Sequence, residues 1–253
     1  IRPTWEYVKG YTYLITLTNS HNAGHSLLSQ REGQKKAMKR FFEGRKAEGL
    51  MARLGKRFHI TNYEVTYGKN GWHPHHHILV FSDKYLGITE YSELETELKE
   101  HWINCCRLSK LPLPNMQHGL DLADGTYADQ YIGKWGVEHE MTKGHIKKGK
   151  EGGLTPFDLL QLSFEDELVH GRKPSQLFKE YAAAFKGARQ LFWSRGLKDV
   201  FGLRDVSDDE IMDKVTDDAI QLTEVEDLVF RLLLKYSQYV EFLIAIEEEQ
   251  KGV

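Results

Sequence analysis

Three short segments in the first third of the chain have the composition of β-strands. The segments 11–18, 58–67 and 75–81 are rich in β-branched and aromatic residues, which is typical of β-strands. The last two are separated by Gly68-Lys69-Asn70-Gly71, whose Asn-Gly pair favours a tight turn, so we expect an antiparallel hairpin. Because Pro74 lacks an amide hydrogen, it fits best at the start of the strand, which would leave His73 outside the sheet.

Other segments have apolar residues at helical spacing. The first runs from about residue 30 to 54, where Gly44 and Gly49 weaken the pattern and favour a division into two helices. A second amphipathic helix is expected at 89–108, followed by a short strand at 115–122.

Two further helices are predicted from their first residues. Thr126 opens a capping-box pattern, and Thr155-Pro156 places a threonine at the cap and a proline in the first turn. From there to the end we expect only helices. The preceding segment, 139–153, is rich in lysine and glycine and has no apolar period, so we interpret it as a loop. The predicted order is therefore mixed strands and helices to about residue 136, followed by helices, which is an α+β pattern.

Composition narrows the class of protein. The 253 residues are 40% hydrophobic and 28% charged, as in an ordinary soluble globular protein with one substantial core. No apolar run approaches the roughly 20 residues that a membrane span needs. Cys105 and Cys106 are adjacent in a predicted helix, so we interpret them as reduced packing residues of a cytoplasmic protein. Since Ile1 is not an initiator methionine, we expect processing or further residues upstream.

Charge is unevenly distributed along the chain. Residues 204–253 hold 14 carboxylates and 5 Lys or Arg, a local charge of −9, although the whole chain has a net charge of −3. The segment 1–203 therefore carries +6, which favours a polyanionic partner for this part of the chain.

Four histidines fall within the five residues 73–77. Alternate side chains of a strand share a face, so His75 and His77 should point the same way and His76 the other way. Glu64, across the predicted hairpin, would add a carboxylate. Two nitrogens and one oxygen suit Mn²⁺, Zn²⁺ or, less tightly, Mg²⁺, and leave positions open for water or a phosphate oxygen. The alternative is a set of ordinary surface histidines on a hairpin, with Glu64 as a solvated strand residue. We expect no metal contact from the other two histidines: His73 would at most touch a substrate, and His76 would pack behind the sheet.

A second cluster of reactive side chains lies in the segment 126–135. Tyr127 and Tyr131 are four residues apart and would share one helical face with Lys134. A phenol with a pKa near 10 is a weak nucleophile at neutral pH, and a nearby ammonium favours its phenolate form. The alternative is an amphipathic helix that buries both tyrosines.

Together these motifs resemble the HUH endonucleases, in particular the rolling-circle replication initiator (Rep) proteins of small plasmids. The resemblance covers about residues 11–200. It is carried by the LITLT segment at 14–18, by Glu64 to His77, by Tyr131-Ile132-Gly133-Lys134, and by the segments 154–160 and 185–198.

The resemblance implies a site and an activity. His75, His77 and Glu64 would bind the metal, with Tyr131 as nucleophile and Lys134 as its helper. We expect the metal to be a divalent cation, Mn²⁺ or Mg²⁺. The implied reaction nicks and rejoins single-stranded DNA at a replication origin through a 5′-phosphotyrosine. Tyr127 stands where many plasmid relatives have a glutamate, as in the paired-tyrosine arrangement of phage initiators and some transposases.

The resemblance also implies a fold, domains and partners. The fold class would be α+β, with a central antiparallel sheet, flanking helices and a helical C-terminal region, and with the histidine strand in the middle of the sheet. We expect an HUH endonuclease domain at 1–153, and a helical region at 154–253 that packs on it or binds the origin. The expected partners are single-stranded and origin DNA, a host helicase and polymerase, and a second copy of the chain, with no membrane. Phosphate contacts are predicted from Lys143, Lys147 and Lys148 and from the basic helix near 35–45. The alternatives are an HUH transposase or relaxase, or a non-catalytic module that binds metal and origin DNA.

Overall fold

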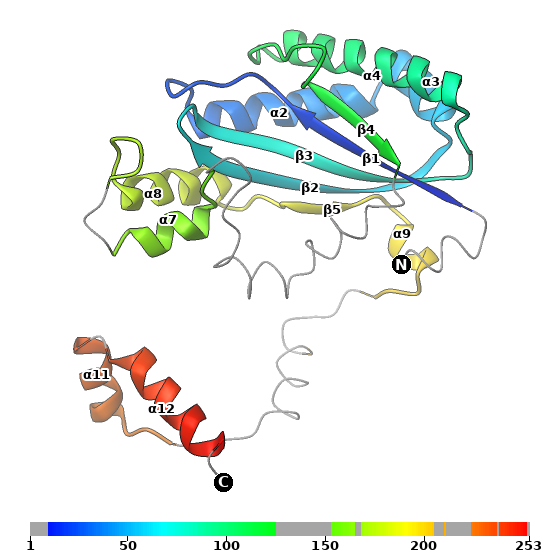
Figure 1. Ribbon diagram of the computed structural model, residues 1–253. Helices are drawn as coiled ribbons and strands as arrows, with labels where there is room; N and C mark the ends of the chain where they lie inside the picture. Colours follow the sequence, from blue (N-terminus) through cyan, green and yellow to red (C-terminus); the bar gives the residue numbers. More distant parts are fainter. Residues whose placement is uncertain are drawn as a thin grey trace. The chain divides into compact units, whose positions relative to one another are not determined.

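The structure is a computed structural model that describes residues 10–124, 153–164, 168–204, 210, 224–236 and 238–251 (Figure 1). It has the predicted α+β class: a five-stranded antiparallel sheet with flanking helices. The strand order is β4-β1-β3-β2-β5, so the strand that carries the histidines is central. The strands are β1 (Tyr11–Thr18), β2 (Lys56–Gly68), β3 (Gly71–Ser82), β4 (Leu120–Asp124) and β5 (Leu191–Trp193).

The described helices occur in all parts of the chain. They are α2 (Leu27–Phe42), α3 (Arg45–Arg53), α4 (Ile88–Leu108), α7 (Pro156–Leu162), α8 (Pro174–Phe185), α9 (Leu197–Val200), α11 (Asp227–Lys235) and α12 (Tyr239–Lys251). The predicted division of the first helix is confirmed, since α2 and α3 are separated at Gly44, which has a φ of 100°. The predicted start at Thr155 is also confirmed, because its side chain and that of Asp158 form a reciprocal capping box.

The sheet has two chemically different faces. Ile15, Leu17, Ile78 and Val80 point to one side, which we call the helix face, and form the main core with residues of α2, α3 and α4. Figure 1 shows these helices together on that side of the sheet. The opposite side is the histidine face, because it carries His75 and His77. One end of that face is apolar and forms a smaller core from Leu14, Phe58, Ile60, Leu79, Phe81, Ala123, Trp193, Leu197 and Phe201.

The hairpin of β2 and β3 turns at Lys69 and Asn70, as the sequence predicts. Gly71 has a φ of 85°, a left-handed conformation that strains any residue with a side chain. A Cβ atom at Gly71 would also lie 2.8 Å from the Cα of Ala23, so both conformation and space require glycine here.

Two predicted strand limits near the site are wrong. β3 begins at Gly71, so His73 lies inside the sheet, opposite Thr66. Pro74 is tolerated within the strand because the β1 register reaches β3 only as far as His75, opposite Thr18. The carbonyl of Pro74 accepts a hydrogen bond from the Gln34 amide of α2 (3.0 Å).

The strand predicted at 115–122 begins later, at Leu120. The Asn115 side-chain oxygen accepts hydrogen bonds from the backbone N–H groups of Gln117 (3.1 Å) and His118 (2.7 Å). These bonds close a turn over residues that would otherwise extend the strand. Cys105 and Cys106 are buried and not joined by a disulfide, as expected.

The described residues of 153–164 and 168–203 belong to the same compact unit as the sheet. β5 pairs with β2, Leu154 exchanges two 2.8 Å backbone hydrogen bonds with Tyr67, and Trp72 donates its indole N–H to Glu180 of α8 (3.1 Å). The expectation of helices only after 155 is therefore wrong at β5. The chain separates into compact units at 203/204. The boundary at 153/154 between an endonuclease domain and a helical region stays a prediction.

The second compact unit contains α11 and α12, which touch through the rings of Phe230 and Tyr239 (centroids 5.6 Å apart). Leu228 and Tyr236 are exposed there. Packing of these helices on another surface stays a prediction. Among the described helices, none has the length and apolar character that a membrane crossing needs.

Candidate metal centre

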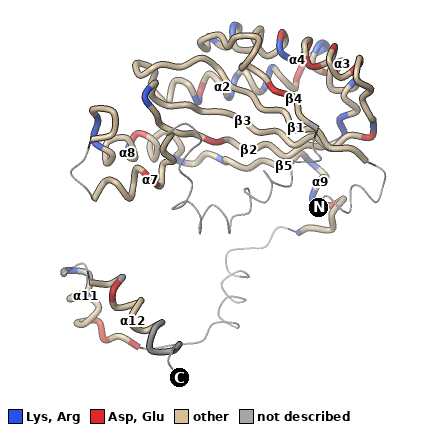
Figure 2. Tube along the Cα trace, in the orientation of Figure 1, with Lys and Arg blue, Asp and Glu red and all other residues tan. Residues whose placement is uncertain are grey.

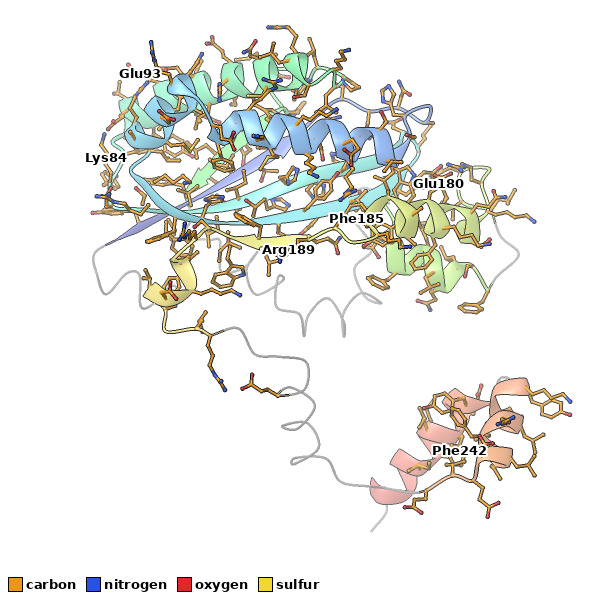
Figure 3. All side chains as sticks on the ribbon, turned by 180° about the vertical axis from the view of Figure 1, so that it is seen from behind. Lys84, Glu93, Glu180, Phe185, Arg189 and Phe242 are labelled. Carbon is orange, nitrogen blue, oxygen red and sulfur yellow. The ribbon has the colours of Figure 1, made fainter. Side chains whose placement is uncertain are left out.

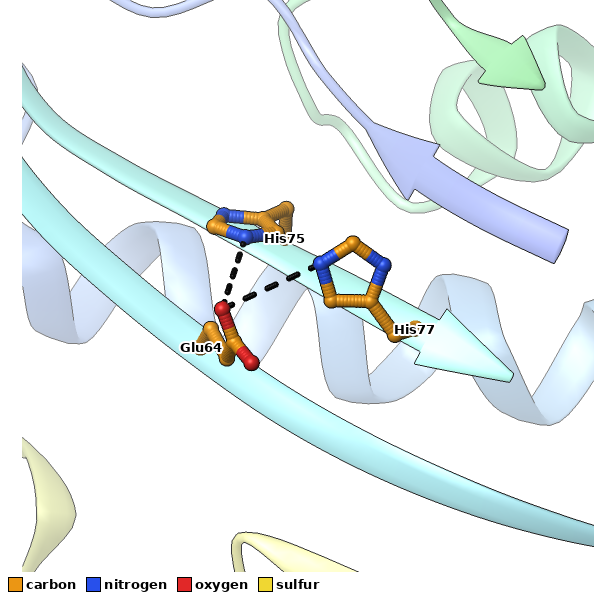
Figure 4. A group of neighbouring side chains, drawn as sticks. All are labelled: Glu64, His75 and His77. Carbon is orange, nitrogen blue, oxygen red and sulfur yellow. Dashed lines mark ion pairs between the residues drawn. The ribbon is translucent and has the colours of Figure 1, made fainter. Parts of the chain in front are cut away.

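Glu64, His75 and His77 come together on the histidine face (Figure 4). Glu64 lies on β2 directly opposite His75 on β3, and His77 is two residues further along the same strand. The Glu64 Oε2 atom is 3.3 Å from His75 Nε2 and 3.8 Å from His77 Nε2. The two imidazoles are nearly perpendicular, at 87°, so their nitrogens converge on the carboxylate from different directions. The hairpin pairing alone thus produces the three-residue group that the sequence predicts.

The Thr16 hydroxyl holds the His77 ring in a defined orientation. Thr16 lies opposite His77 on β1, and its Oγ1 atom is 3.0 Å from His77 Nδ1. When Nδ1 carries the ring proton and donates it to this hydroxyl, the Nε2 lone pair faces Glu64 and is available to a cation. A hydrogen bond to the second ring nitrogen is the usual way in which proteins orient a histidine ligand.

Asn62 holds the other oxygen of the carboxylate. Its side-chain amide donates a 2.9 Å hydrogen bond to Glu64 Oε1, which leaves Oε2 to face the imidazoles. Asn62 is buried and lies opposite His77 in the register, so it can position Glu64 from within the sheet. Sequence reasoning missed Asn62; its place two residues before Glu64 on the same strand face was the available signal.

The group is somewhat wider than a bound divalent cation requires. A metal bound at about 2.1 Å to each ligand needs ligand atoms roughly 3.0–3.4 Å apart, whereas one donor atom from each residue lies within 4.8 Å of the others, so the side chains would draw together around a cation. When His77 donates from Nδ1 to Thr16, its Nε2 lone pair and the Glu64 carboxylate face one another, and a cation relieves that repulsion. The Glu64 side chain is 34% exposed, whereas those of His75 and His77 are 14% and 13% exposed, so a ligand can reach the group from solvent.

His73 lies next in line on the same face. Its ring is 5.2 Å from that of His75 and stacks on His21 at 4.6 Å with an interplanar angle of 12°. Burial, aided by the neighbouring His75 and His21, lowers the pKa of His73 to about 4. His21 follows β1 and was not predicted as part of the site, because only the fold brings it to His73.

His76 points to the helix face, as predicted. Its ring is buried and stacks on Tyr63 at 4.4 Å, and burial lowers its pKa to about 3. His76 therefore packs behind the sheet and is not part of the metal group, our name for Glu64, His75 and His77.

The other predicted site residues divide into two sets. The catalytic candidates Tyr127, Tyr131 and Lys134 and the DNA-binding candidates Lys143, Lys147 and Lys148 lie outside the described residues. The basic segment near 35–45 is described, and its lysines and arginines are exposed. Figure 2 shows that these basic positions lie on the helices that cover the helix face. Contacts from α2 to a nucleic acid would therefore be on the opposite side of the sheet from Glu64.

The amino-acid sequence is similar to that of a known protein. No family model matches the chain, and no solved structure matches it. The chain is 27% identical over 266 aligned residues to a protein of Streptomyces lividans named "Protein rep". The alignment covers 78% of this chain and 58% of the relative, so the chain spans less than two thirds of the length of the protein it resembles.

Proposed function

We propose that this protein is a replication initiator that nicks and rejoins single-stranded DNA at an origin. The observation that carries the proposal is the convergence of His75 and His77 on Glu64 from neighbouring strands, at 3.3 and 3.8 Å. The relative named "Protein rep" supports the assignment to replication. Duplex DNA and host replication proteins would then be partners of the chain.

Glu64, His75 and His77 would hold a divalent metal, Mn²⁺ or Mg²⁺ by the family resemblance. When bound, the metal polarises the scissile phosphate and balances the charge that develops during its substitution. Thr16 and Asn62 fix the ring of His77 and the carboxylate of Glu64, so these ligands stay oriented before DNA arrives. The central position of β3 makes the two histidines part of the rigid sheet rather than of a loop.

The covalent step would use Tyr131. Its phenol oxygen forms a bond to the phosphorus, the bond from phosphorus to the 3′-oxygen breaks, and the phenol proton is transferred so that a free 3′-hydroxyl results. Lys134 would favour the phenolate and balance phosphate charge. The product is a 5′-phosphotyrosine that retains the diester bond energy, so the strand can be rejoined without ATP. Tyr127 would carry out a second cleavage that ends a round of replication.

The test uses labelled single-stranded oligonucleotides tiled across the DNA that flanks the gene, incubated with the protein and Mn²⁺. A denaturing gel should reveal a protein–DNA adduct, which Tyr131→Phe abolishes and His75→Ala strongly reduces. Tyr127→Phe should retain the first nick and lose strand transfer. An adduct that survives Tyr131→Phe unchanged would reject this residue as the nucleophile.

The same assay separates the rival functions. A non-catalytic origin-binding module would bind the oligonucleotides but form no adduct at any metal concentration. An HUH transposase or relaxase would form the adduct on the ends of a mobile element or on a transfer origin, and not on a replication origin.

A further inference from the structure

A basic segment with exposed apolar side chains lies next to the candidate metal centre. Residues 186–198, which we call the β5 segment, contain four basic residues and no carboxylate. Arg189 and Arg195 are exposed, and neither pairs with a carboxylate in the part of the chain that the structure describes. Leu191 and Phe192, on the edge strand β5, are 37% and 47% exposed. Uncompensated positive charge beside exposed apolar side chains is a combination that suits an anionic partner with apolar parts.

The register of the sheet brings the β5 segment to the metal group. Leu191 lies opposite Asn62, the residue that donates to Glu64, and the backbone N–H of Tyr63 donates to the carbonyl of Gln190 at 2.8 Å. Continuing this antiparallel register by one residue puts Arg189 opposite Glu64.

The alternation of side chains assigns Arg189 to a face. Ala188 packs against the cluster around Tyr63, on the helix face, so its neighbour Arg189 belongs to the histidine face. Figure 3 shows Arg189 beside β5. A guanidinium at this position lies one strand away from the carboxylate of the metal group.

The chemistry of the segment fits a single-stranded polynucleotide. Arginines contact backbone phosphates, and exposed apolar or aromatic side chains accept unpaired bases by stacking. Leu191 and Trp193 share the histidine face with Asn62 and Ile60, and the Lys198 ammonium lies 6.0 Å from the Trp193 ring centroid. A duplex would present its phosphates but would keep its bases from these side chains.

We propose that the β5 segment is a contact surface for single-stranded DNA, with Arg189 as the phosphate contact nearest the metal group. This inference rests on the proposed function, since it describes how the strand would reach the site. Arg189 and Arg195 bind the backbone on either side of β5, and Leu191 and Trp193, which lie between them on the histidine face, contact bases.

The experiment measures binding of fluorescein-labelled oligo(dT) by anisotropy in EDTA, where no metal-dependent cleavage takes place. The double variant Arg189→Ala/Arg195→Ala should bind about tenfold more weakly at low salt. The slope of log affinity against log salt concentration should become shallower by about 1.4, because each lost phosphate contact on a single strand contributes about 0.7. Both side chains are exposed, so thermal unfolding should match that of the wild type.

The matched control is Lys173→Ala/Lys179→Ala, which removes the same charge from exposed positions at the start of and within α8. It should leave the affinity within about twofold of wild type and the salt slope unchanged. Equal losses in the two double variants, or an unchanged affinity of the arginine variant, would overturn the proposal. Mn²⁺ titration and adduct formation are measured separately. If the protein forms no adduct and only the arginine variant loses oligo(dT) binding, the proposed nicking function is wrong and the proposed contact surface stands.

Discussion

Replacing Thr16 with valine should weaken metal binding without disturbing the sheet. Valine has nearly the same shape and the same β-branched preference for strands, so only the hydroxyl is lost. That hydroxyl is 3.0 Å from His77 Nδ1 and is the group that orients the ring toward Glu64. Without it, the imidazole can rotate or place its proton on Nε2, where the metal should bind.

The expected loss of metal affinity follows from the role of this hydrogen bond, which contacts the ligand His77 but not the metal itself. Loss of such a partner typically reduces metal affinity by about 10- to 100-fold. His77 is also held by the neighbouring strands, so we expect the lower end, about tenfold or roughly 1.4 kcal/mol. The free energy of unfolding without metal should fall by only about 0.5–1.5 kcal/mol, the net contribution of one hydrogen bond.

Isothermal titration of the purified protein with Mn²⁺ measures this change directly. Thr18→Val is the matched control, because Thr18 is on the same face of β1 but its hydroxyl donates to the carbonyl of His118 (2.7 Å). Its Mn²⁺ affinity should remain within about twofold of wild type. If Thr16→Val binds Mn²⁺ as tightly as the wild type, or if both valine variants lose equally, the hydroxyl does not orient His77 as we describe.

Three further variants test the charge, the turn and the packing. Glu64→Gln keeps the shape but removes the anion, so saturating Mn²⁺ should no longer raise the melting temperature; an undiminished rise would contradict the role of Glu64. Gly71→Ala should lower the free energy of unfolding by about 1–3 kcal/mol in urea titrations, since φ is 85° and Ala23 is close, whereas Gly68→Ala, with open space, should not. Burial lowers the pKa of His59 to about 3, so only the unfolded chain gains this proton below about pH 6.5. As the pH is lowered from about 6.5 to 3, the free energy of unfolding should then decrease by up to roughly 1.4 kcal/mol per pH unit. The His59→Phe variant should lose less stability over the same range, and parallel curves for the two proteins would refute this.

The sequence was sufficient to predict the hairpin and the group it holds. The Asn-Gly turn fixes which residues of the two strands face each other, and alternation then selects His75 and His77 over His76. These are local relations, and they survive folding because turn and register are set within a few residues. The predicted α+β class is also confirmed, because most strands and helices can be recognised from the residues of their own segments.

The rest depends on partners that are distant in sequence. The sequence predicts that Pro74 begins the strand, which would leave His73 outside the sheet. In the structure the strand starts earlier, because β1 ends opposite His75 and so requires no amide hydrogen from Pro74, and because the Gln34 amide binds the Pro74 carbonyl. β5 has three residues, too few to show a period, and exists because β2 offers it an edge. Thr16 and Asn62 are ordinary strand residues until the sheet brings them to His77 and Glu64.

The register of β3 has a consequence for how the protein responds to mutation. The same strand buries Ile78 and Val80 beneath the helices and presents His75 and His77 to the other side. A slip of one residue would exchange these sets and drive two imidazoles into the core, so every apolar contact made by β3 also opposes misplacement of the ligands. Core substitutions far from Glu64 that loosen this strand should therefore be felt first as poorer metal retention, before the protein unfolds.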